Sequence, residues 1–253
     1  MKKAFSYFLV FVGLQLVGGA VVQTLWQLLS GSTDKTAAML VTMTGSVSVI
    51  TIVVFLWSRW TQVSPNWLRT RPWTVLVWSV VASFGALVPS AWIQEQMPEL
   101  PNLAEDTFDT LLGSPVGYVT IGLLAPLTEE LVMRGAILRS LLKDMRPWLA
   151  IVLSALLFAL VHMNPVQMPH AFLIGLLLGW MYWRTGSILP GVAYHWANNS
   201  VAFVLYHFYP SDDTKLIDIF QTQQHVLMAV GFSLLILLPA LYQLHLWMRR
   251  ADD

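Results

Sequence analysis

Long apolar runs occupy most of this 253-residue chain and limit the folds that are open to it. Hydrophobic residues make up 56% of the sequence and charged residues only 11%, outside the average of soluble proteins. Several runs approach the roughly 20 residues that a helix needs to cross a bilayer. Because lipid offers no hydrogen bonds to the backbone, spanning segments form helices or closed barrels. We therefore predict an all-α, polytopic membrane bundle, with residues 1–253 forming one integral membrane domain.

Eight apolar segments are expected to span the membrane, with boundaries uncertain by several residues. Their ranges are 4–29, 37–57, 73–93, 116–130, 148–163, 169–183, 188–206 and 225–247. The first run continues past Gly18 and Gly19 to Leu29, which favours an uncleaved span over a signal peptide. Prolines interrupt the fourth to seventh segments, as expected where helices bend around a cavity and protein satisfies the freed backbone groups.

The distribution of charge supports an even number of spans, because cytoplasmic loops accumulate Lys and Arg. With a cytoplasmic N-terminus and eight spans, the inside set is Lys2, Lys3, Arg59, Arg69, Arg71, Arg134, Arg139, Lys143, Arg146, Arg184, Arg249 and Arg250. Only Lys35 and Lys215 fall outside. The outer loops carry Asp34, Glu95, Glu99, Glu105, Asp106, Asp109, Asp212, Asp213 and Asp218. We predict a multi-pass protein of the cell (inner) membrane with both termini in the cytoplasm.

The composition also excludes several classes of partner and chemistry. The net charge is zero and no basic cluster is interleaved with aromatic residues, so nucleic acid is not an expected partner. The chain has no cysteine, which rules out disulfides, a thiolate nucleophile and palmitoylation. The partners to expect are the lipid bilayer and a peptide or protein associated with it.

Two acids lie at the end of the fourth apolar segment, and a base follows them within one helical turn. Glu130 and Arg134 are four residues apart, the spacing at which an acid and a base pair on one helix face. Glu129 points about 100° away from its neighbour and stays free for another role. The simpler interpretation is a pair of acids near the membrane surface, neutralised by nearby bases.

Two further polar pairs stand in the fifth and seventh segments. Phe158 lies one helical turn before His162, and His195 lies one turn before Asn199. Ionisable groups inside spans are costly unless they face a bundle interior or a wet cavity. Hydrogen-bonded packing of His162 and a polar helix-helix contact of His195 with Asn199 are the alternatives to catalysis.

Together these three motifs resemble the CaaX protease and bacteriocin-processing (CPBP) family, which includes the Ras-converting prenyl-protein endopeptidases. The family pattern is Glu-Glu-x-x-x-Arg, then Phe-x-x-x-His, then His-x-x-x-Asn, on successive helices. Here the matching residues are Glu129, Glu130, Arg134, Phe158, His162, His195 and Asn199. The resemblance covers about residues 116–206, including the stretch that leads into the third motif, whereas the other segments carry no signature.

The resemblance implies an intramembrane endopeptidase in which a glutamate activates water. Glu129 would be the general base, and His162 would orient the water or share its proton. His195 and Asn199 would donate hydrogen bonds to the oxyanion of the tetrahedral intermediate. Structural support would come from Glu130, Arg134 and Phe158.

A metal is left open at this stage, because the family is often described as metalloprotease. Glu129, His162 and His195 could ligate a divalent ion such as zinc, but a glutamate that binds metal cannot also be the free base. Other intramembrane proteases do not fit: the sequence lacks His-Glu-x-x-His, has no Asp within a predicted span, and offers no good Gly-x-Ser context.

Two other classes of function remain alternatives. A membrane scaffold or bacteriocin-immunity factor could keep this fold without catalysis. A transporter would also place acids and histidines in broken helices, but it would show internal repeats, which this sequence lacks.

Two geometric expectations follow from the segment boundaries. With a fifth span starting near Trp148, His162 lies roughly 20 Å deep, whereas Glu129 lies near the cytoplasmic side. They can meet if the fifth helix starts before the bilayer or if Glu129 sits more than a turn inside. Gly175 and Gly179 form a small-xxx-small pair, which predicts close helix packing without chemistry.

Overall fold

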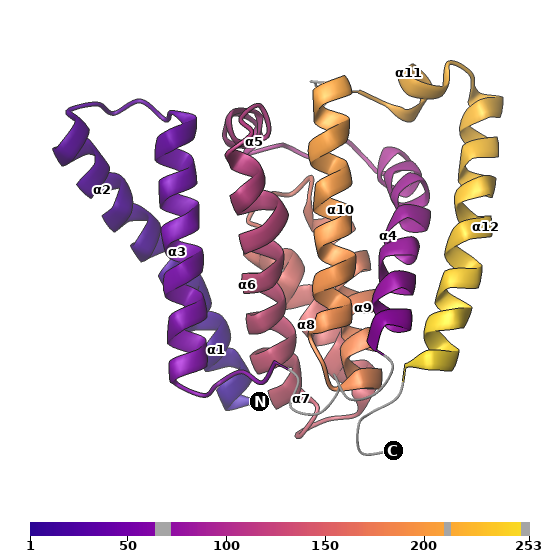
Figure 1. Cartoon of the computed structure of the whole chain (residues 1–253), viewed down its shortest axis with the longest axis horizontal. Coiled ribbons are helices and arrows are strands. Elements are labelled where there is room, and N and C mark those ends of the chain that lie inside the picture. The colour runs from indigo at the N-terminus through magenta and orange to yellow at the C-terminus, as the bar shows by residue number, and fades with distance from the viewer. Residues whose placement is uncertain (64–71, 210–213, 249–253) are drawn as a thin grey trace.

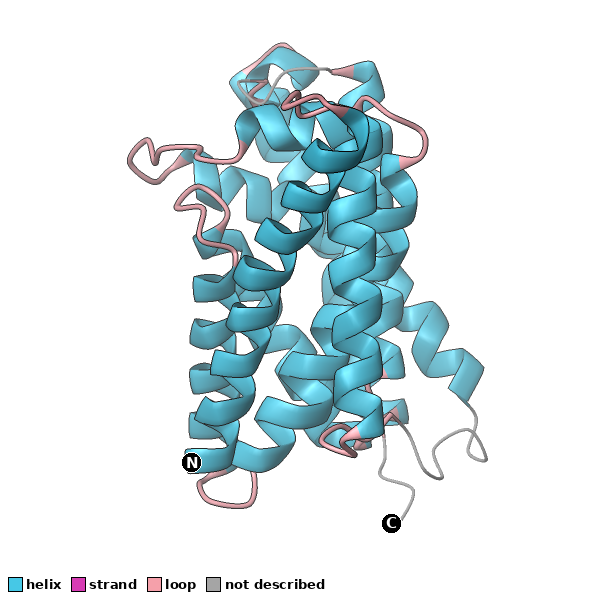
Figure 2. Ribbon diagram, turned by 90° about the vertical axis from the view of Figure 1, so that its left-hand side faces the viewer, coloured by secondary structure: helices cyan, strands magenta, loops and turns pink. Residues whose placement is uncertain are grey.

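The computed structural model, which describes residues 1–63, 72–209 and 214–248, is a bundle of helices joined by loops (Figures 1 and 2). This confirms the all-α prediction. The helices are α1 Lys2–Gly13, η1 Leu14–Gly18, α2 Gly19–Ser30, α3 Ala37–Trp57, α4 Pro72–Glu95, α5 Glu105–Leu112, η3 Val119–Leu124, α6 Ala125–Val132, η4 Met133–Leu138, α7 Arg139–Leu141, α8 Pro147–Val161, α9 Met168–Thr185, α10 Leu189–Phe208, α11 Leu216–Phe220 and α12 Gln223–Trp247; η marks a π-helix.

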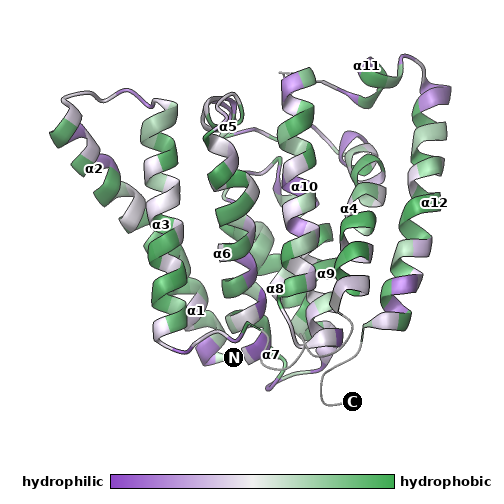
Figure 3. Ribbon diagram, in the orientation of Figure 1, coloured by the Kyte–Doolittle hydropathy of each residue, from purple (hydrophilic) through white to green (hydrophobic). Residues whose placement is uncertain are grey.

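Four helical stretches of the described chain are long and apolar enough to cross a membrane. They are Lys2–Ser30, Ala37–Trp57, Trp73–Glu95 and Gln223–Trp247. Their residues are largely apolar, as Figure 3 shows for α3 and α12, and most of them are not buried by other parts of the protein. The protein is therefore a multi-pass membrane protein. The other four expected segments are helical as well, but they are shorter or more polar, and eight spans stay a prediction.

The ends of the bundle agree with the predicted separation of charge. The N-terminus and α7 lie at one end, whereas α5 and α11 lie at the other (Figure 1). The first end carries predicted inside residues such as Lys2 and Lys143, and the second carries acids such as Glu105 and Asp218. Six predicted loop charges lie outside the described residues: Arg69, Arg71, Asp212, Asp213, Arg249 and Arg250. Which end faces the cytoplasm is not fixed by the fold.

The fourth helical run is longer than the sequence suggested. The segment expected at about 116–130 begins as helix at Val119 and continues through α6, η4 and α7 to Leu141. The predicted end at 130 was wrong because Arg134, which looked like a boundary charge, is neutralised inside the bundle by Glu130. All six residues of η4 are buried, so this run is the centre of the core.

The first two motifs were expected to lie at different depths in the membrane. The longer helical run removes this difference. Glu129 lies about 18 Å inside the end of the run at Leu141, at 1.5 Å of rise per residue. His162 lies about 22 Å beyond the start of α8 at Pro147. Since these two ends face each other across a short loop at one end of the bundle, both motifs lie at similar depth.

Two π-helices, η3 and η4, flank α6. A π-helix shifts the backbone hydrogen-bond register and is often found at functional sites. In η4 the Gly135 carbonyl accepts from the Gln62 amide at 3.3 Å, and the Thr61 hydroxyl donates to the Leu131 carbonyl at 2.7 Å. A Cβ at Gly135 would lie 2.0 Å from Thr61 Oγ1, so the glycine permits this approach. These contacts attach the segment after α3 to the motif helix, the run from α6 to α7 that carries Glu129, Glu130 and Arg134.

The small residues of α9 permit its close contact with α8. A Cβ at Gly175 would lie 3.0 Å from Ala155 Cα, and one at Gly179 would lie 3.0 Å from Ile151 Cγ2. Contacts at these distances are at the limit of what packed side chains tolerate. The predicted packing role of the glycine pair therefore has a clear structural basis.

We expect Gly179→Leu to lower the free energy of unfolding by about 1–3 kcal/mol, the usual cost of overpacking a close contact. Thermal unfolding of the purified protein in detergent measures this. Gly231→Leu is the matched control, because a Cβ at Gly231 in α12 meets nothing within 4 Å. A wild-type unfolding midpoint for Gly179→Leu would contradict the packing role.

Candidate active site

The adjacent acids of α6 point in different directions, as the helical period predicts. Glu130 is fully buried and pairs with Arg134, whose Nη1 donates to Glu130 Oε1 at 2.6 Å. The Glu129 side chain is 23% exposed and makes no contact with Arg134 that is short enough for an ion pair. One acid is therefore committed to the core, and the other is accessible.

Arg134 connects the motif helix to the two helices behind it. Its Nη2 donates to the Gly175 carbonyl in α9 at 3.3 Å. Its guanidinium carbon lies 4.4 Å from the centre of the Phe158 ring in α8, a cation-π geometry. Removing one partner of a buried ion pair is strongly destabilising because the other charge stays uncompensated. The pair thus fixes α6 relative to α8 and α9.

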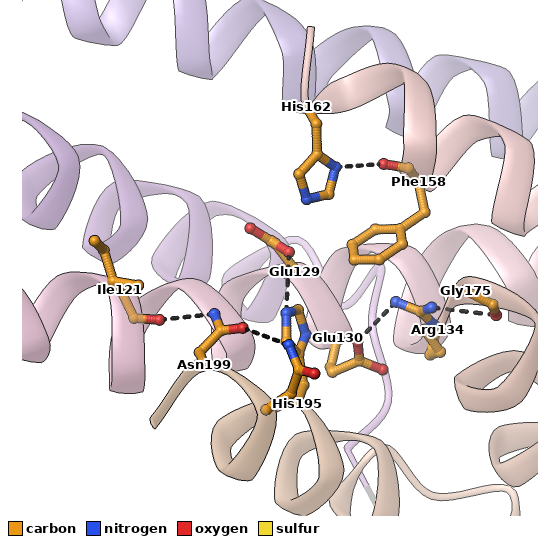
Figure 4. Close-up of polar contacts among 10 residues, drawn as sticks. Ile121, Glu129, Glu130, Arg134, Phe158, His162, Gly175, His195 and Asn199 are labelled. Carbon is orange, nitrogen blue, oxygen red and sulfur yellow. Dashed lines mark hydrogen bonds and ion pairs between the residues drawn. The ribbon is translucent and has the colours of Figure 1, made fainter. Parts of the chain in front are cut away.

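His195 of α10 lies between the two carboxylates of α6. Its Nδ1 is 3.3 Å from Glu130 Oε1, and its Nε2 is 3.8 Å from Glu129 Oε2 (Figure 4). Because the Glu130 carboxylate only accepts, Nδ1 carries the hydrogen and donates it. Gly191, one turn earlier, allows this approach, since a Cβ there would lie 2.6 Å from Glu130 Oε2.

His162 enters the site from the end of α8. Its Nδ1 lies 2.8 Å from the Phe158 carbonyl oxygen, so this nitrogen donates and Nε2 keeps a free lone pair. The Phe158 ring meets His162 edge-on at 5.0 Å and His195 edge-on at 5.8 Å between ring centres. One buried aromatic ring therefore orients both imidazoles. The sequence had predicted only that Phe158 gives structural support.

Asn199 is held by neighbours other than His195. Its Nδ2 donates to the Ile121 carbonyl in η3 at 2.9 Å, and its Oδ1 accepts from Asn198 Nδ2 at 3.3 Å. This uses one of the two amide hydrogens and leaves the second free. Asn198 is buried and fixes which end of the Asn199 carboxamide faces the site, a contribution that the sequence did not reveal.

The Oε2 atom of Glu129 is buried and has no hydrogen-bond partner in the described part of the chain. It makes a long ion-pair contact with His195 Nε2, 3.8 Å away. A buried carboxylate oxygen without a donor is costly, so such atoms usually bind water or a ligand. The arrangement can therefore accept a proton from a molecule bound next to Glu129.

A third histidine borders the site. His170, in the first turn of α9, is close enough to His162 and His195 for their charges to interact. The sequence analysis missed this residue because it belongs to none of the three motifs. The one local signal is Pro169, next to His170 in the first turn of α9, which marks the start of the helix.

The predicted metal ligands do not converge. Within residues 1–63, 72–209 and 214–248, no three side chains of His, Asp or Glu come close enough to hold one ion. Glu129 Oε2 and His195 Nε2 are 3.8 Å apart, so two of the three candidate ligands lie close together, but the third does not join them. The side chains as arranged do not fit a His₂Glu zinc site.

Residues 112–201 match the family model of Rce1-like type II CAAX prenyl endopeptidases. This part of the chain is a domain of that family, which confirms the resemblance in the three motifs. All seven motif residues fall inside the matched range. No curated protein and no solved structure matches the chain significantly.

Replacing Arg134 by Gln should lower the free energy of unfolding by about 3–5 kcal/mol, because Glu130 would remain buried without its partner. Thermal and denaturant unfolding in detergent measure the change. Arg146→Gln removes the same charge from an exposed residue near the same end of the bundle and should change stability by less than about 0.5 kcal/mol. Equal stability of the two variants would contradict the structural role of the pair.

Proposed function

We propose that the protein is an intramembrane endopeptidase that hydrolyses a peptide bond in a membrane-associated peptide or protein. The observation that carries this proposal is the buried Oε2 of Glu129, which lacks a hydrogen bond and lies 3.8 Å from His195 Nε2, within the segment that matches a peptidase family. The proposed setting is one membrane domain of eight spans with cytoplasmic termini.

Glu129 acts as the general base in this mechanism. Its carboxylate removes a proton from a bound water, and the water oxygen attacks the carbonyl carbon of the scissile bond. His162 Nε2, with its free lone pair, accepts the second hydrogen bond of the water and orients it. Glu129 then returns the proton to the leaving nitrogen, the carbon-nitrogen bond breaks, and a carboxylic acid and an amine are formed.

The oxyanion of the tetrahedral intermediate needs donors. Asn199 offers the amide hydrogen that Ile121 does not use. His195 Nε2 donates only in the doubly protonated ring, because Nδ1 already donates to Glu130. A single oxyanion donor of this kind is worth about 3 kcal/mol.

The proposed mechanism assigns the activation of water to Glu129 and routes no step through a metal. This choice is supported by the described residues, among which no three candidate ligands converge. The family description names CAAX prenyl proteins as substrates. We propose the broader class of membrane-associated peptides, since α1 to α4 and α12, outside the matched range, will also shape substrate access.

The variant Glu129→Gln should lose hydrolysis by about 10²–10⁴-fold, the contribution of a general base, because the amide cannot accept the proton of water. Its unfolding midpoint should stay close to that of the wild type, since the amide is nearly isosteric. Screening membrane-adjacent peptides against both proteins, purified in parallel, provides the assay. Glu105→Gln, an exposed acid at the far end of the bundle, is the matched control and should keep full activity.

Wild-type turnover by Glu129→Gln would reject the mechanism. A folded wild-type protein that cleaves none of the screened peptides would instead favour the scaffold alternative.

For Asn199→Ala we expect kcat to fall by about one to three orders of magnitude with a smaller change in KM, as for the loss of one oxyanion donor. Asn198→Ala should have a smaller effect on kcat, because Asn198 only fixes the orientation of its neighbour. Steady-state kinetics on a cleaved peptide separates the two. If Asn198→Ala lost kcat while Asn199→Ala kept it, the carboxamides would be wrongly assigned.

A further inference from the structure

A cavity of about 560 Å³ lies at the end of the bundle that holds the N-terminus, away from the Glu129 site. It is an open cavity lined by the start of α1, the residues after α3, and the end of the motif helix in η4 and α7. Figure 3 shows hydrophilic residues gathered where α1 begins and where α7 ends. Five lining residues are cations: Lys2, Lys3, Arg59, Arg139 and Lys143.

The positive charge of this cavity is not balanced by acids. The acidic residue in its lining, Asp144, is already paired with the amino group of Met1. None of the five cations forms an ion pair with any residue in the described ranges. Like charges that converge on one cavity repel each other and attract an anion. The charge distribution therefore favours the binding of an anionic ligand.

A second, less polar cavity of about 430 Å³ shares part of this lining and continues along α1. The shared residues include Tyr7 and Trp60, and the second cavity extends to Val10. The rings of Tyr7 and Trp60 lie 5.2 Å apart and form a common wall. A ligand that fills both spaces must have a negatively charged end and an apolar end.

The position of both cavities agrees with such a ligand being a lipid. α1 begins the first candidate span, so its Lys2 end lies at the headgroup level and Val10 lies deeper. Tyr and Trp are enriched at this level of membrane proteins. Basic pockets between spanning helices on the cytoplasmic side bind anionic headgroups.

We propose that these joined cavities bind one anionic phospholipid, with its phosphate among the five cations and the start of an acyl chain along α1. The bound lipid connects α1 to the motif helix through Arg139 and Lys143. This site shares no residue with the Glu129 chemistry, so it stands whether or not the protein hydrolyses peptides.

The test is equilibrium binding of labelled phosphatidylglycerol to the whole protein purified in neutral detergent. We expect phosphatidylglycerol to bind about tenfold or more tightly than phosphatidylcholine, given five cations near the phosphate. Lys3→Gln and Arg139→Gln should each weaken binding by about fivefold, the value of one basic residue near an anionic headgroup. Arg146→Gln, which removes a cation outside the lining, should change binding by less than about twofold.

Unfolding midpoints measured in parallel show whether each variant is folded. If Arg139→Gln is not folded, Lys143→Gln, at an exposed residue of the same lining, takes its place. Equal binding of both lipids, or equal effects of Lys3→Gln and Arg146→Gln, would overturn the proposal. Complete displacement of phosphatidylglycerol by millimolar inorganic phosphate would overturn the lipid assignment and indicate a site for free phosphate.

Discussion

The buried ion pair of Glu130 and Arg134 is the interaction on which the site depends. It allows a charged helix to pass through the apolar centre of the bundle, and Arg134 contacts both α8 and α9. The same carboxylate holds Nδ1 of His195. With Glu130 engaged in this way, its neighbour Glu129 faces the accessible side, and its Oε2 has no hydrogen bond among the described residues. One acid thus supports the position of the other.

Periodicity predicted much of this site because its contacts follow from helix geometry. Residues four apart share a face, so the pairing of Glu130 with Arg134 and the contact of Phe158 with His162 could be predicted from spacing. The apolar runs similarly predicted the helices. Each of these features arises within a single helix.

The features that the sequence could not give involve contacts between helices or shifts in backbone register. The π-helices η3 and η4 leave no clear pattern, and the continuation to Leu141 depends on the burial of Arg134 against α8 and α9. Gly191 matters because Glu130 packs against it from another helix. His170 and Asn198 act through neighbours that only the fold brings together.

The most direct test of a water activated by Glu129 is a single turnover of a cleaved membrane-anchored peptide in H₂¹⁸O, after treatment of the purified protein with a metal chelator. Mass spectrometry then locates the label. The account predicts cleavage, one ¹⁸O in the new C-terminal carboxylate, and none in the protein fragment that contains Glu129. Label in the Glu129 carboxylate would indicate a covalent intermediate, and cleavage that is lost with the chelator and restored by zinc would indicate a metal; either result would contradict the account.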